Sequence, residues 1–423
     1  MNILVIGSGG REHAICTAFK RSEKAGKIFC ANGNAGIAQV AECIDIRPDN
    51  IAALVDFASA NDIDMTFVGG ETPLALGIVD EFEKLGLKII GASKKAAQLE
   101  ASKAFAKDFM ARHGVPTAEF RTAYSTSEAV DFLKSGEFGD ESKPVVVKAD
   151  GLAAGKGVVV AQNRAGAIAA IGEMASLVGQ NAAEKIVLEE CLVGREVSLI
   201  MFADGSDFAL MPPTRDHKRI GEGDTGPNTG GMGTITDAAL LSEIQTQQIV
   251  DEIIRPTLEG CKQEGFPFRG ILFLGLMMTA AGPKLLEYNV RFGDPETQSI
   301  LVRLNTDIVD ICEAMLVGTL SSMKIDWQPG NSACVILAAE GYPQKPKTGD
   351  LIEGLSEAGK LPNITIFHSG SAWNPEGGMV TAGGRVLGVT ATADSLPQAI
   401  DRAYEAVGKI SWQGMQYRRD IGK

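Results

Sequence analysis

A glycine-rich loop between two short apolar runs is the first part of the chain with residues suited to chemistry. Residues 144–161 read Pro-Val-Val-Val-Lys-Ala-Asp-Gly-Leu-Ala-Ala-Gly-Lys-Gly-Val-Val-Val-Ala, and the valine runs at both ends predict two strands. Glycines lack Cβ, so backbone N–H groups in such a loop can approach phosphate oxygens, while lysines add positive charge. Alone, the pattern fits a plain hairpin with solvated lysines equally well. The residues expected at the phosphates are Lys148, Gly151, Gly155, Lys156 and Gly157.

A second cluster, far downstream, carries oxygen ligands and a guanidinium group. Residues 285–296 read Leu-Leu-Glu-Tyr-Asn-Val-Arg-Phe-Gly-Asp-Pro-Glu, and in a strand Glu287, Asn289 and Arg291 share one face. Carboxylate and amide oxygens suit Mg²⁺ that bridges phosphates, and the guanidinium suits a phosphoryl group or a substrate carboxylate. A solvated strand face explains this triplet alone more often. Together with the glycine loop, it predicts an ATP site with its metal.

The first predicted strand also ends in a glycine turn. Residues 3–14 read Ile-Leu-Val-Ile-Gly-Ser-Gly-Gly-Arg-Glu-His-Ala, which is close to a dinucleotide fingerprint except that Glu12 stands at the third glycine position. The second strand is followed by Ala-Asn-Gly-Asn (31–34), without the acidic residue that binds ribose. A nicotinamide enzyme is therefore disfavoured. A helix N-terminus with Arg11 still suits the phosphate of a sugar phosphate, and a purely structural turn is the alternative.

Two further polar segments suit a small-molecule pocket. Residues 216–219 (Asp-His-Lys-Arg) lead into residues 224–233 (Asp-Thr-Gly-Pro-Asn-Thr-Gly-Gly-Met-Gly), a loop rich in glycine, hydroxyl, amide and charged groups. A mobile surface loop fits this pattern equally well. Residues 189–192 (Glu-Glu-Cys-Leu) close a strand, and as a hinge they suit an adenine edge while Glu196 accepts hydrogen bonds from ribose hydroxyls.

Length and composition limit the class of protein. The 423 residues suffice for roughly three domains, and the net charge of −13 disfavours nonspecific binding to nucleic acid or anionic membranes. Seven scattered cysteines and four isolated histidines give neither a disulfide framework nor zinc spacing. No targeting segment is recognised, and the longest apolar run, near 271–281, is too short to span a bilayer. We expect a cytoplasmic monomer that binds small molecules, with no nucleic-acid or membrane partner.

Strand and helix patterns divide the chain into three parts, 1–101, 102–326 and 327–423. In the first part, short apolar strands alternate with amphipathic helices, which predicts a parallel sheet. The second part contains a compact lid at about 117–192, and the third reads as a small α+β or barrel-like module after a Trp-Gln-Pro-Gly linker. We expect an α/β and α+β multidomain fold. Specific expectations are strands at 3–6, 28–31, 65–68, 88–90, 271–278 and 284–289, and helices at 51–60, 74–85, 102–114, 165–177, 241–264 and 395–407.

Together these segments closely resemble the ATP-grasp superfamily, and within it the glycinamide ribonucleotide synthetases. The likeness runs nearly end to end, and its most specific strings are Lys-Ala-Asp-Gly-Leu-Ala-Ala-Gly-Lys-Gly (148–157) and Asn-Thr-Gly-Gly-Met-Gly (228–233). Glu-x-Asn-x-Arg is shared more widely. The resemblance implies an ATP-grasp fold with a parallel-sheet domain before it. Further matching segments are 7–14, 71–74, 102–103, 216–219, 224–233, 287–298, 341–343, 383–387 and 417–421.

The resemblance also implies roles for individual residues, with ATP and Mg²⁺ or Mn²⁺ as cofactors. The implied nucleotide-binding residues are Lys103, Lys148, Gly151, Gly155, Lys156, Gly157, Glu189, Glu190, Leu192 and Glu196, with the loop 151–157 closing over the phosphates. The implied metal ligands are Glu287 and Asn289, and the implied catalytic residues are Lys148, Arg291 and Asp294. The implied substrate-binding residues are Gly9, Gly10, Arg11, Glu71, Asp216, Lys218, Asn228, Thr229, Gly230 and Gly231.

The implied reaction joins glycine to 5-phosphoribosylamine through glycyl phosphate, consuming ATP in de novo purine biosynthesis. Gly275 departs from the superfamily pattern, because many members carry another metal-binding carboxylate there; a second metal would need substrate, water or an unidentified carboxylate. Residues 69–70 (Gly-Gly) and 234–237 (Thr-Ile-Thr-Asp) also differ from the usual family sequence. The alternatives are another ATP-grasp ligase or carboxylase, which the 228–233 string disfavours, and a noncatalytic nucleotide sensor.

Overall fold

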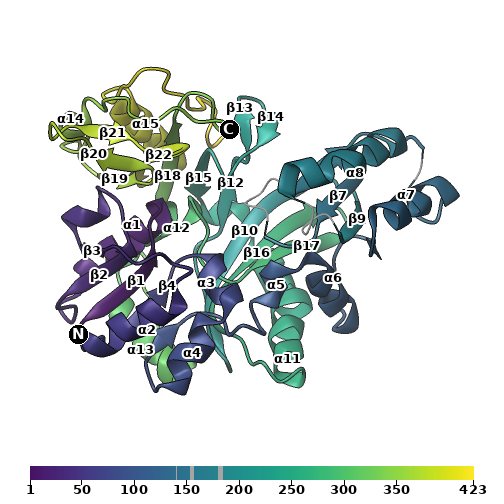
Figure 1. Cartoon of the computed structure of the whole chain (residues 1–423), viewed down its shortest axis with the longest axis horizontal. Coiled ribbons are helices and arrows are strands. Elements are labelled where there is room, and N and C mark those ends of the chain that lie inside the picture. Colours follow the sequence, from purple (N-terminus) through teal and green to yellow (C-terminus); the bar gives the residue numbers. More distant parts are fainter. Residues whose placement is uncertain (140, 153–156, 180–183) are drawn as a thin grey trace.

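Three sheets of four or more strands, with their covering helices, make up most of the fold (Figure 1). The computed structural model describes residues 1–139, 141–152, 157–179 and 184–423. A parallel N-terminal sheet lies at one end of the molecule and a small antiparallel sheet, the lid, projects at the other (Figure 1). A long antiparallel sheet lies between them and continues into the C-terminal module (Figure 1).

The N-terminal sheet is parallel, as predicted, with strand order β3-β2-β1-β4-β5. Its central strands are buried, as expected where helices cover both faces of a parallel sheet. The carboxyl ends of β1 and β4 lie side by side, so the segments that follow them, which carry Arg11 and Glu71, meet at one edge. The elements are β1 Ile3–Gly7, α1 Gly10–Lys20, β2 Ile28–Asn32, η1 Ile37–Gln39, β3 Glu42–Ile44, α2 Ile51–Ala60, β4 Met65–Val68, α3 Glu71–Leu76, α4 Ile78–Lys84, β5 Ile89–Ile90 and α5 Gln98–Ala101.

The lid is a four-stranded antiparallel sheet in the order β6-β9-β7-β8, with α7 and α8 packed on it. Its core consists of β-branched and aliphatic side chains, among them Val145, Val147 and Leu188. The predicted hairpin is β7–β8, in which Val145 pairs with Ala161 and Lys148 with Val158. The elements, with the preceding helix, are α6 Lys103–Arg112, β6 Phe120–Ala123, α7 Thr126–Ser135, β7 Val145–Ala149, β8 Val158–Ala161, α8 Arg164–Val178 and β9 Ile186–Glu190.

The long sheet crosses the predicted boundary at 327, because β15 pairs with β18. Its order is β17-β16-β10-β12-β15-β18-β22-β19, with β11 paired to β10. The predicted antiparallel pair at 271–278 and 284–289 corresponds to β16–β17. The domain boundaries themselves stay predictions. The strands are β10 Arg195–Asp204, β11 Phe208–Leu210, β12 Thr214–Asp216, β15 Gly233–Thr236, β16 Arg269–Thr279, β17 Gly282–Asn289, β18 Asn331–Ala338, β19 Ile364–His368 and β22 Arg385–Ala393.

Two predicted helices are interrupted for identifiable reasons. The helix expected at 74–85 is split at Gly77, whose φ of 93° ends α3. The helix expected at 241–264 contains a π-helical turn just before Pro256, which lacks a backbone N–H donor. The remaining elements are β13 Arg219–Gly221, β14 Thr225–Asn228, η2 Ala238–Leu240, α10 Glu243–Ile249, η3 Val250–Ile254, α11 Arg255–Gln263, α12 Glu296–Leu301, α13 Ile308–Val317, η4 Leu320–Ser322, α14 Leu355–Ala358, β20 Ser371–Trp373, β21 Met379–Thr381 and α15 Leu396–Val407.

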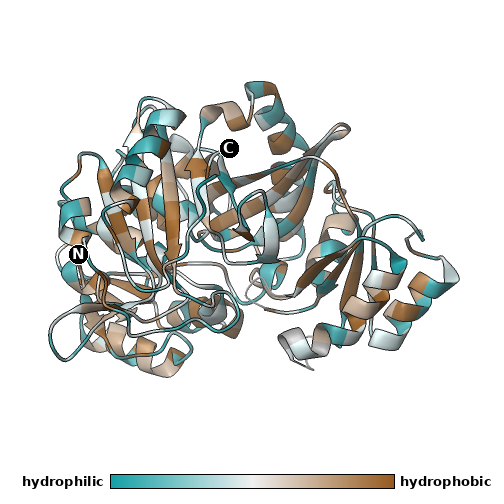
Figure 2. Cartoon of the chain, turned by 90° about the horizontal axis from the view of Figure 1, so that it is seen from above, coloured by the Kyte–Doolittle hydropathy of each residue, from teal (hydrophilic) through white to brown (hydrophobic). Residues whose placement is uncertain are grey.

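Hydrophobic residues are concentrated on the strands of the sheets and on parts of the helices (Figure 2), and many of them are buried. The C-terminal module has its own core, in which Val335, Val389 and Ala403 bring β18, β22 and α15 together. Within the described residues, every helix is too short or too polar to span a membrane.

Candidate active site

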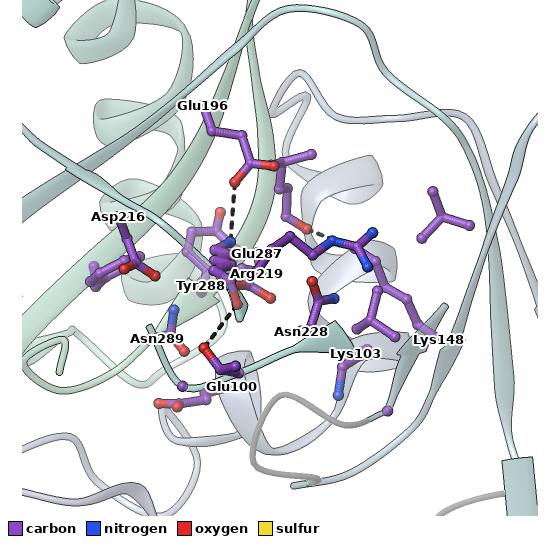
Figure 3. A pocket seen from close by; sticks show the side chains of 18 of the residues that line it. Glu100, Lys103, Lys148, Glu196, Asp216, Arg219, Asn228, Glu287, Tyr288 and Asn289 are labelled. Carbon is purple, nitrogen blue, oxygen red and sulfur yellow. Dashed lines mark hydrogen bonds and ion pairs between the residues drawn. The ribbon is translucent and has the colours of Figure 1, made fainter. Parts of the chain in front are cut away.

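A cavity of about 1040 Å³ is enclosed by all three sheets and by the C-terminal module. In Figure 3, Lys103 and Lys148 lie on one side, Asp216 lies on the other, and Glu287 and Asn289 lie between them. Gly155 and Lys156 lie outside the described residues, and Gly9, Gly10 and Gly231 are not part of the lining. The predicted residues that line the cavity are Arg11, Glu71, Lys103, Lys148, Gly151, Gly157, Glu189, Glu190, Leu192, Glu196, Asp216, Lys218, Asn228, Thr229, Gly230, Glu287, Asn289, Arg291 and Asp294.

A buried carboxylate joins two lysines below the lid. Lys148 Nζ lies 2.7 Å from Glu189 Oε1, and Lys107 Nζ lies 2.8 Å from Glu189 Oε2. Lys107 also donates to Thr117 Oγ1 at 2.7 Å, and Lys148 donates to the Leu286 carbonyl at 3.3 Å. Burial lowers the pKa of Lys107 to about 8, although the Glu189 charge opposes this shift. The Glu189 side chain therefore orients lysines, which leaves the backbone of the predicted hinge to meet a nucleotide.

The glycine loop is tied to the start of α6. Asp150 accepts hydrogen bonds from Ser102 Oγ at 3.1 Å and from the Ala104 N–H at 3.2 Å. Ser102 is itself the N-cap of this helix, with its Oγ accepting from the Phe105 N–H. Lys103 Nζ donates to the Gly151 carbonyl at 2.8 Å. These contacts place Lys103 beside the predicted phosphate loop.

The strand β17 presents the predicted metal ligands next to a β-bulge. Gly275 pairs with Glu287 and Leu276 with Leu285, so Leu286 is an extra residue on its strand. Leu286 and Glu287 both line the cavity, where the Leu286 carbonyl accepts from Lys148 Nζ.

Lys218 lies between two carboxylates of the cavity. Its Nζ is 3.2 Å from Glu196 Oε2 and 3.9 Å from Glu287 Oε1. Burial opposes its charged form, but Glu196 and Glu287 outweigh this effect and raise the pKa of Lys218. This position connects the predicted ribose-binding and metal-binding residues.

Two arginines share one carboxylate beside the N-terminal sheet. Arg291 Nε lies 3.3 Å from Glu71 Oε2, and Arg11 Nη1 lies 4.0 Å from the same oxygen. Glu100, which sequence reasoning missed, holds Arg291 Nη2 at 2.8 Å and accepts from the Val290 N–H. Arg291 is thereby held in one orientation before any ligand arrives.

The glycine turn after β1 surrounds an internal carboxylate. The Gly9 N–H donates to Glu12 Oε2 at 2.6 Å, and Arg11 Nε lies 2.6 Å from Glu12 Oε1. A Cβ atom on Gly7 or Gly69 would lie within 2.5 Å of the buried Glu12 side chain. These glycines therefore make room for Glu12, whose carboxylate occupies the Gly9 N–H, and phosphate binding at this helix N-terminus stays a prediction. Arg11 is the member of the turn that lines the cavity.

Residues of the C-terminal module complete the other end of the cavity. Arg385 Nη1 donates to the carbonyls of Gly230, at 2.5 Å, and Asp294, at 2.6 Å. Tyr342 Oη accepts from the Gly230 N–H at 3.0 Å. Sequence reasoning assigned no role to Lys107, Glu100, Tyr342 or Arg385. The family strings at 341–343 and 383–387 contain the last two, and the i, i+4 spacing from Lys103 could have pointed to Lys107.

The donor set fits a divalent cation that also binds phosphates. Glu287 and Asn289 offer one carboxylate and one amide oxygen, the hard ligands that Mg²⁺ and Mn²⁺ prefer. Across the described parts of the chain there is no group of three or more His, Cys, Asp or Glu residues arranged to hold a metal. A cation here would therefore take its remaining ligands from phosphate and water.

Comparison with known proteins agrees with this architecture. Models of the N domain, the ATP-grasp (A) domain and the C domain of phosphoribosylglycinamide synthetase match residues 1–100, 101–297 and 332–423. The chain belongs to the phosphoribosylglycinamide synthetase family. Among family members, it is 44% identical over 422 residues to the phosphoribosylamine–glycine ligase of Caldanaerobacter subterraneus, covering 100% of this chain and 99% of the relative. It is 45% identical to that of Pseudomonas aeruginosa, with coverage of 100% and 97%.

Solved structures show the same fold. The phosphoribosylamine–glycine ligase of Thermotoga maritima, also a synthetase of this family, superposes with a TM-score of 0.86 at 33% identity over 100% of both chains. The biotin carboxylase domain of Hydrogenobacter thermophilus 2-oxoglutarate carboxylase superposes with a TM-score of 0.73 at 18% identity, covering 98% of this chain and 91% of that one. The predicted ATP-grasp fold is confirmed.

Proposed function

We propose that the protein ligates glycine to 5-phosphoribosylamine at the expense of ATP, giving glycinamide ribonucleotide, ADP and phosphate in purine biosynthesis. The observation that carries this proposal is one cavity that joins a lysine-rich end under the lid to an arginine-rich end between the N-terminal sheet and the C-terminal module. A triphosphate needs the first kind of surface and a sugar phosphate the second. Full-length relatives named phosphoribosylamine–glycine ligase support it.

The nucleotide is assigned to the lid end of the cavity. Lys103 and Lys148 would contact the phosphates, and the backbone of 189–192 would meet the adenine edge. Glu196 would accept hydrogen bonds from the ribose. Since Lys148 is paired with Glu189, the triphosphate has to compete for an ammonium group that is already oriented. The part of the glycine loop at 153–156, with Gly155 and Lys156, lies outside the described residues.

Glu287 and Asn289 are assigned to Mg²⁺ or Mn²⁺. When bound, such a cation neutralises negative charge on the phosphates. The protein's own contribution is to hold the side-chain oxygens of Glu287 and Asn289 on β17, beside Lys148 and Arg291. The negatively charged phosphate oxygens would then meet positive charge on several sides.

The chemical steps need positioned charge more than acid–base groups. A glycine carboxylate oxygen attacks the γ-phosphorus of ATP, the bond to the β–γ bridging oxygen breaks, and glycyl phosphate and ADP form. The amine nitrogen of phosphoribosylamine then attacks the carbonyl carbon, phosphate leaves, and the nitrogen loses a proton. Arg291, fixed by Glu100 and Glu71, would offset charge at the transferring group. Asp294 is assigned to the same catalytic region.

The test is a coupled assay of ADP release by the whole protein with each substrate omitted in turn. We expect ADP formation that requires glycine and phosphoribosylamine together. ADP formation with another acid or amine would favour a different ATP-grasp ligase or carboxylase, and ATP binding without turnover would favour a sensor. The cytoplasmic location, the restriction to small-molecule partners and the monomeric state stay predictions. Light scattering would test the oligomeric state.

A further inference from the structure

The C-terminal module reaches the cavity through two side chains that hold one loop. Arg385, at the start of β22, donates through Nη1 to the Gly230 and Asp294 carbonyls, and its Nη2 lies 3.3 Å from Asp294 Oδ2. Tyr342 Oη accepts from the Gly230 N–H. The C-terminal module thus contacts both the N–H and the carbonyl of Gly230 in the loop 228–231.

The fit around this loop leaves little free space. A Cβ atom on Gly230 would lie 3.0 Å from Arg385 Cζ, and one on Gly384 would lie 2.4 Å from the Tyr342 ring. Gly231 has a φ of 112°, and a Cβ there would lie 2.7 Å from Asp216 Oδ1. The loop position is therefore set by packing as well as by hydrogen bonds.

The same cluster contacts the N-terminal turn. Asp294 Oδ2 would lie 3.2 Å from a Cβ atom on Gly9, and the Phe292 carbonyl accepts from Arg11 Nη1 at 3.2 Å. Arg385 consequently bridges the loop 228–231 to the segment that touches Arg11. Within the described residues, Lys103, Lys148 and the hinge at the nucleotide end form no hydrogen bond or ion pair with Arg385 or Tyr342.

We infer that Arg385 and Tyr342 are positioning residues for the acceptor amine, and that the loop 228–231 serves phosphoribosylamine rather than ATP. This inference rests on the proposed function. Both side chains act through the loop, and Arg385 also acts through Asp294, which lies beside the turn that carries Arg11. The C-terminal module thereby sets where the amine stands relative to the transferring group.

The experiment measures kcat and the KM of all three substrates for Tyr342→Phe and Arg385→Lys. Tyr342→Phe keeps the ring against Gly384 and removes one hydrogen bond, so KM for phosphoribosylamine should rise about fivefold. Arg385→Lys loses the forked contacts and should raise it about tenfold or more. KM for ATP should stay within about twofold in both variants, since the nucleotide end is untouched.

Two further variants keep the test sharp. Gly230→Ala pushes the loop from its own side and should raise the same KM. Lys347→Met, in the same module, removes only an exposed ion pair with Glu340 and should change none of the constants. Melting curves establish that each variant is folded. An equal rise in all three KM values, or an unchanged KM for phosphoribosylamine, would overturn the inference, whereas a wild-type protein without joint substrate dependence would refute the proposed function instead.

Discussion

The ammonium group of Lys148 lies 2.7 Å from the carboxylate of Glu189, which is almost completely buried. The second oxygen of that carboxylate is occupied by Lys107, whose side chain is only 2% exposed. Two ammonium groups against one carboxylate leave a net positive charge below the lid. This excess charge is the feature that would attract a triphosphate in a chain whose net charge is −13.

Replacing Lys107 should weaken ATP binding without any direct contact to ATP. In Lys107→Met, Glu189 keeps only Lys148 as a partner, so Lys148 is less available to phosphates. We expect KM for ATP to rise about tenfold and the free energy of unfolding to fall by about 3 kcal/mol, because a buried pair is broken. Urea unfolding and steady-state kinetics measure these effects. Lys107→Arg keeps the charge and is the matched control; equal effects in both variants would argue against the electrostatic explanation.

Removing the Glu287 carboxylate should abolish most of the activity. Glu287→Gln keeps the size of the side chain but loses a charged oxygen ligand, so kcat should fall by about 10³-fold or more. Binding of Mn²⁺ in the presence of ATP, followed by electron paramagnetic resonance, should weaken in parallel. Glu196→Gln is the control, because Glu196 also contacts Lys218 but is assigned to ribose. Near-normal turnover of Glu287→Gln at ordinary Mg²⁺ would contradict the assignment.

Asp150 links helix stability to the phosphate loop. Asp150→Ala removes the acceptor of Ser102 Oγ and of the Ala104 N–H, which should lower the free energy of unfolding by about 1–2 kcal/mol. KM for ATP should rise as well, since Lys103 and Gly151 are positioned by the same contacts. Asp150→Asn keeps one acceptor oxygen and should show smaller changes in both quantities. A stability loss with an unchanged KM would separate the two roles.

Three buried histidines should make stability fall with acidification. Burial lowers the pKa of His13 to about 3, with repulsion from His368 adding to it, and lowers those of His217 and His368 to about 4. The unfolded chain binds protons below about pH 6.5, but the folded chain does not until these lower values. Between pH 6.5 and its folded pKa, each histidine therefore lowers the free energy of unfolding by up to about 1.4 kcal/mol for each unit that the pH falls.

The histidine effect can be isolated with one variant. His13 Nδ1 accepts a hydrogen bond from the His368 N–H, so His13→Asn keeps an acceptor that does not titrate. Urea unfolding between pH 6.5 and 5 should show a shallower dependence on pH in this variant. The same slope in both proteins would show that His13 does not carry the effect.

Local sequence patterns were sufficient to predict most of the fold. The alternation in 1–101 predicted the parallel sheet, and 51–60 predicted α2 at its observed bounds. The strand β3 was missed because its three residues, Glu-Cys-Ile, are too short and too exposed to show a pattern. Pairing of β15 with β18 was also missed, since a contact over about a hundred residues leaves no local signal.

The candidate site shows the same contrast between residues in local motifs and residues that only long-range contacts bring together. Residues in dense motifs, such as Lys148 and Glu287, were predicted and do line the cavity. Glu12 was treated as a departure from a fingerprint, although it fills the turn that its neighbouring glycines open. Glu100 stands in ordinary-looking sequence, and Arg385 stands in a family string that implied no role for it; only folding brings them to Arg291 and Gly230.

The pairing of β15 with β18 has a consequence for anyone who wishes to divide this protein. A fragment that stops near residue 330 would leave the edge of β15 that pairs with β18 without a partner, and such a bare edge invites aggregation. A cut before β15 breaks its pairing with β12, and a cut after it breaks its pairing with β18, so either boundary leaves an unpaired strand edge.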